Sequence, residues 1–258
     1  MDYRLFQNTA AWELAKAVED GNVSKIKEEV SKNKSLLNFR DTRFGQPSLK
    51  LAIMNSNFKS VKALVELGAD PNMQDTYDGS SPLMEAAQLG LGGFTHDGAD
   101  SKYLKFLLKH GGDANAEEKG VRRKGNGTRY TPLLIAAQNC NLEYVKILVD
   151  AGANVNYNNE YGLNPLGLAV ISSYNPDVVI YLLEKGADFR KPIMRTIDKK
   201  NLYITDGLRF WRYDLGSDLY EKKMQIVKFL KDHGMDYRQT EIPKQYLDKY
   251  SKSYLEKY

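Results

Sequence analysis

The 258-residue sequence has a single cysteine, Cys140, which excludes an intrachain disulfide and a multi-cysteine zinc site. No apolar run approaches the roughly 18 residues of a membrane span. The first residues lack the basic-then-apolar pattern of a secretory signal, so the default expectation is a cytoplasmic protein. A periplasmic or secreted protein whose leader has been removed would look the same. The net charge of +4 is too small to indicate nucleic-acid binding by itself.

What the sequence does contain is an internal repeat with a period of about 33 residues. One motif has a pair of large apolar residues, two variable residues, then Gly-Ala or Gly-Gly, followed by Asp or Asn. Its copies are Leu64–Asn72, Leu107–Asn115, Leu148–Asn156 and Leu182–Asp188, with a weaker one at Phe229–Asp236. The glycine is expected to end a helix in the left-handed conformation, and the Asp or Asn to favour a turn.

A second motif precedes the first and predicts where a helix begins. Its copies start at Ser81-Pro82-Leu83, Thr131-Pro132-Leu133 and Asn164-Pro165-Leu166, each with an alanine three residues after the leucine. The Ser, Thr or Asn is a favoured helix N-cap, and proline suits the first helical position. Each repeat is therefore predicted to be a helix, a turn, a second helix and a loop, which cannot bury its apolar face alone.

The two linked motifs resemble the ankyrin repeat, and the best-kept copy is Tyr130–Ala137. The resemblance implies an all-α solenoid of about six helix-turn-helix units with β-hairpin-like loops, called fingers here. The usual histidine after Pro-Leu is replaced by Lys50, Met84, Leu134 and Gly167, and Arg129 stands where a finger glycine is expected. These departures indicate less regular fingers without changing the predicted fold.

We expect the repeat array to occupy residues 1–241. Its units lie near residues 10–40, 41–75, 76–127, 128–159, 160–190 and 191–241, and the first and last are degenerate caps. Extra residues are predicted within 91–99, in the finger of 117–130, and at 190–204, where the last unit is disrupted. Such insertions are common places for binding features.

A Tyr- and Lys-rich tail, residues 242–258, is expected to pack on the last unit. Tyr246, Tyr250, Tyr254 and Tyr258 are spaced by four, so a continuous helix would place them on one face. Alternatively, Ser253 starts a fresh helical turn. The rings either cover the exposed end of the last repeat or form a stripe that binds a partner.

No catalytic constellation is evident, so we expect no enzyme activity, no cofactor and no metal. His110 and His233 share one repeat position before the helix-ending glycine, where they favour the helix dipole. His96 lies beside acidic residues in an insertion, but a metal site there needs a further ligand. Cys140 stands where the resemblance places a glycine, and it is interpreted as a structural, partly buried thiol.

The resemblance implies that the protein binds another protein through its finger tips and first helices. The predicted contact residues are Arg43, Phe44, Gln46, Tyr77, Asp78, Tyr130 and Tyr161 in the fingers, Met54, Asn55, Gln88, Leu89, Gln138 and Asn139 at the first helices, and Arg122, Arg123 and Lys124 in the long basic finger. Four successive fingers carry an aromatic ring. The rings either bind the partner, as tyrosine often does at interfaces, or pack against the adjacent finger.

The leading hypothesis is a monomeric, non-enzymatic scaffold for an unidentified protein partner. The irregular pattern resembles bacterial ankyrin proteins, which include neutralising partners of toxins, so an immunity-type role is a specific hypothesis. In the alternative, the basic finger of residues 119–129 binds an acidic partner or, less favoured, nucleic acid. Glu117 and Glu118 flank its five basic residues.

Overall fold

The computed structural model describes residues 2–89, 101–120, 129–172, 175–196 and 198–257. The chain divides into two compact units, Met1–Asn154 and Val155–Tyr258, and each is described in turn. The insertion expected at 91–99, including His96, lies outside the described residues. Across the described ranges, no helix is both long enough and apolar enough to cross a lipid bilayer.

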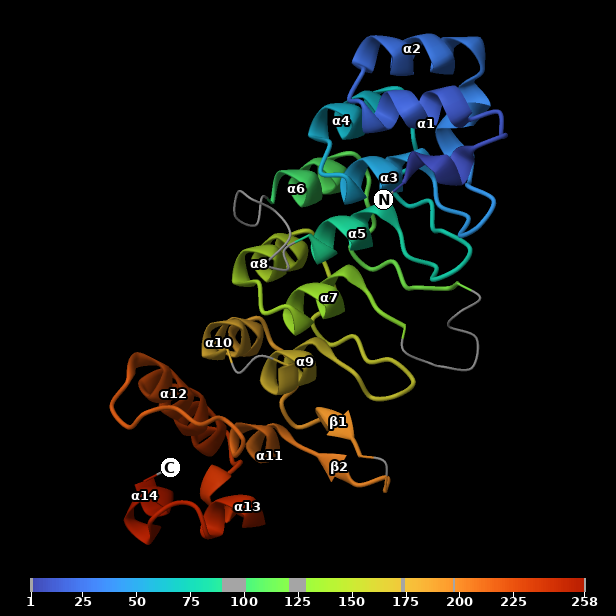
Figure 1. Cartoon of the computed structure of the whole chain (residues 1–258). Helices are drawn as coiled ribbons and strands as arrows, with labels where there is room; N and C mark the ends of the chain where they lie inside the picture. The colour runs from blue at the N-terminus through green and yellow to red at the C-terminus, as the bar shows by residue number, and fades with distance from the viewer. Residues whose placement is uncertain (1, 90–100, 121–128, 173–174, 197, 258) are drawn as a thin grey trace. The chain divides into compact units, whose positions relative to one another are not determined.

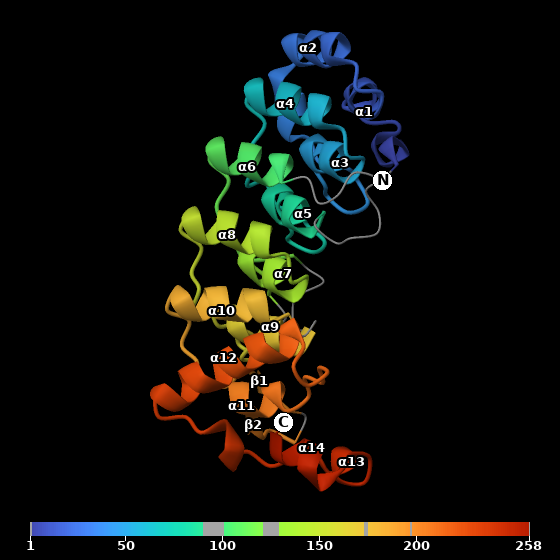
Figure 2. The same ribbon diagram turned by 90° about the vertical axis from the view of Figure 1, so that its left-hand side faces the viewer.

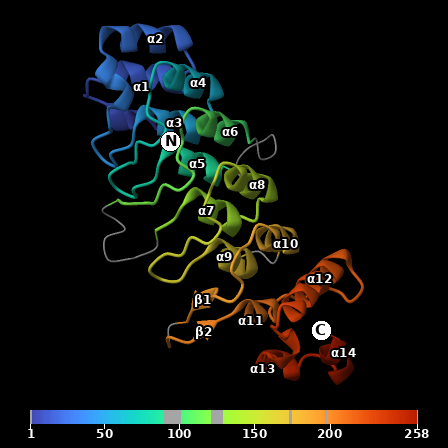
Figure 3. The same ribbon diagram turned by 180° about the vertical axis from the view of Figure 1, so that it is seen from behind.

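Stacked helix pairs build the Met1–Asn154 unit. The pairs are α1 (Trp12–Glu19) with α2 (Val23–Lys32), α3 (Ser48–Met54) with α4 (Phe58–Glu66), α5 (Pro82–Gln88) with α6 (Lys102–Lys109), and α7 (Pro132–Gln138) with α8 (Leu142–Asp150). Short 3-10 helices occupy Tyr3–Phe6 and Lys34–Asn38. Within this unit the first helices form one row and the second helices another, and the fingers lie beside the first row (Figures 1, 2 and 3). The predicted all-α fold of repeated helix pairs is confirmed.

The predicted start and stop signals of the helices are confirmed by their backbone geometry. The side chains of Ser81, Thr131 and Asn164 each accept a hydrogen bond from the backbone N–H three residues further on, at 3.3, 3.3 and 2.8 Å. The helix-ending glycines all have positive φ angles, from +83° to +102°, at Gly68, Gly111, Gly152, Gly186 and Gly234. Local chemistry therefore sets both ends of these helices.

Cys140 ends the first helix of its repeat in the left-handed conformation, with φ +48°. The equivalent turn in the first repeat uses Gly21, with φ +67°. The Cys140 thiol is partly buried and donates to the carbonyl of Ala137 at 3.3 Å. The residue therefore occupies a conformation that favours glycine, and its side chain serves a structural contact.

The core of the Met1–Asn154 unit lies between successive repeats. The repeated leucines of the first helices are at most 1% exposed (Leu49, Leu83 and Leu133), and those of the second helices are fully buried (Leu64, Leu107 and Leu148). Ala136 is also fully buried, because a methyl group lets the next helix approach closely. The burial of these leucines and of Ala136 confirms the register of the motifs.

Asparagine side chains connect neighbouring repeats along the loops. The Asn72 carboxamide donates to the Gly111 carbonyl and accepts from the Asp113 N–H, both at 2.7 Å. Asn115 makes the same pair of bonds one repeat later, to Gly152 and Asn154, at 3.0 and 2.8 Å. Each asparagine thus satisfies a helix-ending carbonyl that has no partner within its own helix.

The Val155–Tyr258 unit contains two more helix pairs among its described residues and a short hairpin. Its elements are α9 (Pro165–Ser172), α10 (Pro176–Glu184), β1 (Met194–Arg195), β2 (Asn201–Leu202), α11 (Ile204–Leu208), α12 (Asp218–Asp232), a 3-10 helix (Tyr237–Gln239), α13 (Lys244–Leu247) and α14 (Lys252–Lys257). Trp211 is fully buried, and its indole N–H donates to the Val170 carbonyl at 2.8 Å. This bond ties the segment after α11 to α9.

A short β-hairpin lies within the segment 190–204, where an insertion that disrupts the last unit was expected. Strands β1 and β2 pair antiparallel, with Met194 opposite Leu202. The hairpin also explains Gly167, one of the departures from the repeat pattern. A Cβ atom at Gly167 would lie 2.3 Å from the Ile193 carbonyl oxygen, so only glycine lets the hairpin approach α9 this closely.

The tail does not form the continuous helix that the tyrosine spacing suggested. It breaks between α13 and α14, and Ser251 caps α14, with its hydroxyl accepting from the Tyr254 N–H at 3.3 Å. The fresh turn therefore begins two residues before the predicted Ser253. Tyr246 is 8% exposed, and its ring meets the Phe210 ring edge-on at 6.4 Å. The Tyr220 hydroxyl donates to the Lys257 carbonyl at 2.8 Å, so the tail contacts α12.

Candidate functional site

The finger tips are closed by acidic or amide side chains that accept backbone hydrogen bonds. The Asp41 carboxylate accepts from the N–H groups of Arg43, Phe44 and Gln46, at 2.8, 2.7 and 2.7 Å. The backbone N–H of Asp41 also donates to the Gln46 carbonyl at 3.0 Å. This finger therefore has a tightly defined backbone.

The next finger repeats this arrangement around Asp75. Its carboxylate accepts from the N–H groups of Asp78 and Gly79, at 2.6 and 3.1 Å, and its own N–H donates to the Ser80 carbonyl at 3.1 Å. The N–H groups of Thr76 and Tyr77 both donate to a carbonyl of the preceding finger, that of Phe44, at 3.2 Å. The two fingers are thus joined backbone to backbone.

The aromatic rings of these two fingers form a pair in which Tyr77 is exposed and Phe44 is half-buried. The Phe44 and Tyr77 rings meet edge-on, with centroids 5.5 Å apart and planes at 69°. The Arg43 guanidinium lies 5.0 Å from the Phe44 ring centroid, and 40% of Tyr77 remains exposed. The two rings pack against each other across adjacent fingers, as one interpretation expected, while the exposed part of Tyr77 leaves partner binding as a prediction.

A buried ionic cluster, formed by Lys50, Asp75 and Glu85, supports the second finger. The Lys50 ammonium lies 2.6 Å from an Asp75 oxygen and 3.6 Å from a Glu85 oxygen. The side chains of Lys50 and Asp75 are 3% and 0% exposed. Burial raises the pKa of Glu85, while Lys50 opposes that shift. Because Asp75 also holds the backbone around Tyr77, this cluster positions the exposed ring.

Sequence reasoning did not find this cluster. Lys50 was recognised only as a departure from the usual histidine, and its carboxylate partners belong to the following repeat. The available signal was a lysine flanked by the apolar residues Leu49 and Leu51 in a helix expected to be buried. A charged side chain at such a position requires a partner.

The third finger approaches the second very closely at its base. The Gly120 N–H donates to the Asp78 carbonyl at 3.2 Å, and a Cβ atom at Gly120 would lie 2.1 Å from the Asp78 carbonyl carbon. Glu118 and Tyr130 close the base, with the Glu118 N–H donating to the Tyr130 carbonyl at 3.0 Å. Arg122, Arg123 and Lys124 lie outside the described residues, so their predicted role stays a prediction.

The predicted residues of the first helices lie at the C-terminal ends of α3, α5 and α7. Gln88 and Gln138 are exposed, whereas Met54, Asn55, Leu89 and Asn139 are half-buried. Gln46, in contrast, is 8% exposed, and its side-chain Oε1 is buried. This burial leaves little of Gln46 for a partner to contact, and its predicted role stays a prediction.

Tyr161 belongs to the other unit, where it is 48% exposed on its own finger. The Asn159 carboxamide oxygen accepts from the N–H groups of Tyr161 and Leu163, at 3.0 and 2.9 Å. The construction of this finger matches those around Asp41 and Asp75. Across the described ranges, no three His, Cys, Asp or Glu side chains are arranged to hold a metal ion.

Comparison with known proteins agrees with the repeat architecture. The family model described as "Ankyrin repeats (3 copies)" matches residues 14–118 and 95–192, more than half of the chain. A predicted ankyrin repeat protein of Rickettsia bellii is 27% identical over 200 residues, which cover 75% of this chain and 67% of that protein.

Two further relatives match over shorter regions. An ankyrin repeat protein predicted in fowlpox virus is 32% identical over 63% of this chain and 43% of its own length. Protein PhlB of Serratia liquefaciens is 34% identical over 47% of this chain and 46% of its own length. The matches thus span less than half of these two relatives.

Proposed function

Because the chain belongs to the ankyrin-repeat family, whose members generally mediate protein–protein interaction, we propose that it binds a protein partner through the finger tips and first helices of its Met1–Asn154 unit. The observation that supports this surface most strongly is the Phe44–Tyr77 ring pair. Tyr77 is exposed and Phe44 is half-buried, and the backbone around both is held by Asp41, by Asp75 and by bonds between the two fingers.

An aromatic surface whose backbone is already fixed favours binding, because less free energy is spent on ordering it. Ordering flexible side chains and loops on association costs free energy, and a surface already fixed in the free protein avoids much of that cost. Tyrosine adds a large contact area with few rotatable bonds. Gln88 and Gln138, exposed at the C-terminal ends of α5 and α7, supply polar groups on the first helices.

The partner can be identified by affinity capture. The full chain, immobilised, is incubated with an extract of its native cells, and the bound proteins are identified by mass spectrometry. An immunity-type role is the more specific proposal, supported by the likeness of the irregular array to bacterial members of the family. It predicts that co-expression of the chain protects cells from the captured protein, and absence of protection would contradict that role.

We expect Tyr77→Ala to weaken binding of the captured partner by on the order of 2 kcal/mol, about thirtyfold in Kd, the scale of an interface hot spot. Tyr130→Ala, in the next finger, is expected to act in the same direction. The loss of the edge-on contact with Phe44 should lower stability by no more than about 1 kcal/mol. Isothermal titration of the purified partner measures the affinity, and a thermal melt measures the stability.

Lys146→Glu provides the matched control, because Lys146 is exposed on α8, in the row of second helices of the same unit. It should leave the affinity within about twofold of the unmodified protein. A larger loss from Lys146→Glu than from Tyr77→Ala would place the partner on the opposite row of helices.

A further inference from the structure

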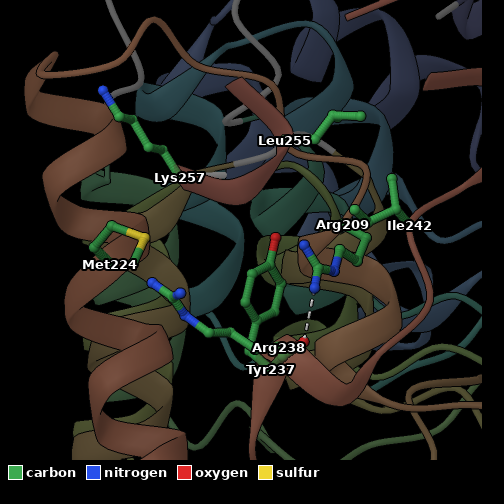
Figure 4. Close-up of a pocket in the computed structure, with 7 residues that line it drawn as sticks. All are labelled: Arg209, Met224, Tyr237, Arg238, Ile242, Leu255 and Lys257. Carbon is green, nitrogen blue, oxygen red and sulfur yellow. Dashed lines mark hydrogen bonds between the residues drawn. The ribbon is translucent and has the colours of Figure 1, made fainter. Parts of the chain in front are cut away.

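A pocket of about 470 Å³ lies within the Val155–Tyr258 unit, between the end of α11, helix α12 and the C-terminal segment (Figure 4). Its lining combines three cations (Arg209, Arg238 and Lys257) with three apolar side chains (Met224, Ile242 and Leu255) and the ring of Tyr237. None of these lining residues is acidic. A concave site that combines apolar walls with convergent polar groups is typical of small-ligand binding.

Arg209 is the buried cation of this pocket. It is 6% exposed, and its Nη2 donates to the Tyr237 carbonyl at 3.1 Å, the bond drawn in Figure 4. Its guanidinium carbon lies 4.0 Å from the Tyr237 ring centroid. Its Nε is buried and has no hydrogen-bond partner among the described residues. A buried guanidinium with an unused N–H is stabilised by an anion that accepts from it.

Of the described neighbours, Tyr237 and Lys223 do not supply that negative charge. Burial raises the pKa of Tyr237 to about 12, so its phenol keeps its proton at neutral pH. Burial, with a smaller contribution from the positive charge of Arg209, lowers the pKa of the nearby Lys223 to about 6. Arg238 is exposed, and its cation adds to the positive potential of the pocket.

We propose that this pocket binds an organic carboxylate that carries a branched apolar group. The carboxylate would accept hydrogen bonds from Arg209 and Arg238, and the apolar group would lie against Met224 and Leu255. Two sources share this chemistry: a free branched-chain acid and the C-terminal residue of a peptide. The pocket lies in a different unit from the finger surface, so its test is independent of the proposed partner binding.

Three probes test the site by isothermal titration into the full chain at neutral pH. 4-Methylpentanoate represents a free acid, N-acetyl-leucine represents a peptide C-terminus, and N-acetyl-leucinamide keeps the apolar group but lacks the carboxylate. We expect one molecule of carboxylate to bind per chain and the amide not to bind. Tighter binding of N-acetyl-leucine would identify a peptide C-terminus as the ligand, and tighter binding of 4-methylpentanoate a free acid.

Arg238→Gln and Lys231→Gln form the matched pair of variants. Both remove one exposed cation close to the end of α12, but only Arg238 lines the pocket. Arg238→Gln should weaken carboxylate binding roughly tenfold, the effect of losing one charge-assisted hydrogen bond, and Lys231→Gln should change it less than twofold. Equal affinity for the amide, no binding at about 10 mM ligand, or equal effects of the two variants would overturn the proposal.

Discussion

Replacing Lys50 with methionine should destabilise the Met1–Asn154 unit by roughly 3 to 5 kcal/mol. Methionine fills a similar volume, so the loss is electrostatic. The substitution leaves the Asp75 carboxylate, which is 0% exposed, without the Lys50 ammonium that lies 2.6 Å away. Glu85, whose pKa is already raised by burial, loses the same cation. Urea unfolding followed by circular dichroism measures the change in free energy.

Asp75→Asn supplies the compensating change. The amide oxygen can still accept from the N–H groups of Asp78 and Gly79, so the finger keeps its turn while the buried negative charge disappears. The double variant of Lys50→Met and Asp75→Asn should therefore be more stable than Lys50→Met alone. A single Lys50→Met variant within about 1 kcal/mol of the unmodified protein would show that the cluster carries little free energy.

Lys223→Met should have the opposite effect and stabilise the Val155–Tyr258 unit. Lys223 is fully buried, and its ammonium nitrogen lies 3.1 Å from the Trp211 carbonyl oxygen. Burial, with a smaller contribution from Arg209, lowers its pKa from 10.5 to about 6. At pH 7 folding therefore requires the loss of a proton that the unfolded chain retains.

The proton that Lys223 loses on folding determines how the stability change caused by Lys223→Met depends on pH. Between pH 6 and 10.5 the unfolded state binds more protons at Lys223, so its burial penalty shrinks as the pH rises. Replacing it should gain about 2 to 4 kcal/mol at pH 7, after about 1 to 3 kcal/mol is subtracted for the unsatisfied Trp211 carbonyl. The gain should be largest below pH 6 and should reach zero at about pH 8 to 10, where the remaining burial penalty equals the cost of the unsatisfied carbonyl. Above pH 10.5 the replacement should cost about 1 to 3 kcal/mol.

Fluorescence of Trp211 during urea unfolding reports on this unit, because the other tryptophan, Trp12, lies in the first unit. Lys222→Met is the matched control on the same helix. Lys222 is partly exposed and lies 3.1 and 3.0 Å from oxygens of Asp177 and Asp218, so its loss should slightly destabilise the unit. A gain from Lys223→Met that stays constant with pH would contradict the proton-based explanation.

The parts of the fold that could be predicted from sequence depend on contacts between residues close in the chain. Ser81, Thr131 and Asn164 cap helices three residues away, and the helix-ending glycines need only their own backbone conformation. Because these local signals recur, they fixed the register of the repeats. That register predicted that Leu133 and Ala136 are buried. Predicting these helix ends and buried positions required no knowledge of contacts between distant residues.

The features that escaped prediction depend on contacts between distant residues. Lys50 and Asp75 are 25 positions apart, and neither shows its partner in the sequence. The pocket around Arg209 exists because the tail breaks at residues 248–251 and returns to α12. No proline or glycine marks that break, so the four-residue tyrosine spacing suggested one helix. The burial of Gln46 was likewise not evident from the sequence around it.

Hydrogen–deuterium exchange of the free chain and of its complex with the captured partner tests the proposed binding surface most directly. We expect slower exchange in the complex at residues 41–46 and 75–80, which form the fingers of Phe44 and Tyr77, and at the ends of α5 and α7. Exchange in α4, α6 and α8 should stay unchanged. Protection confined to α4, α6 and α8, with the two fingers exchanging as in the free chain, would contradict the central claim.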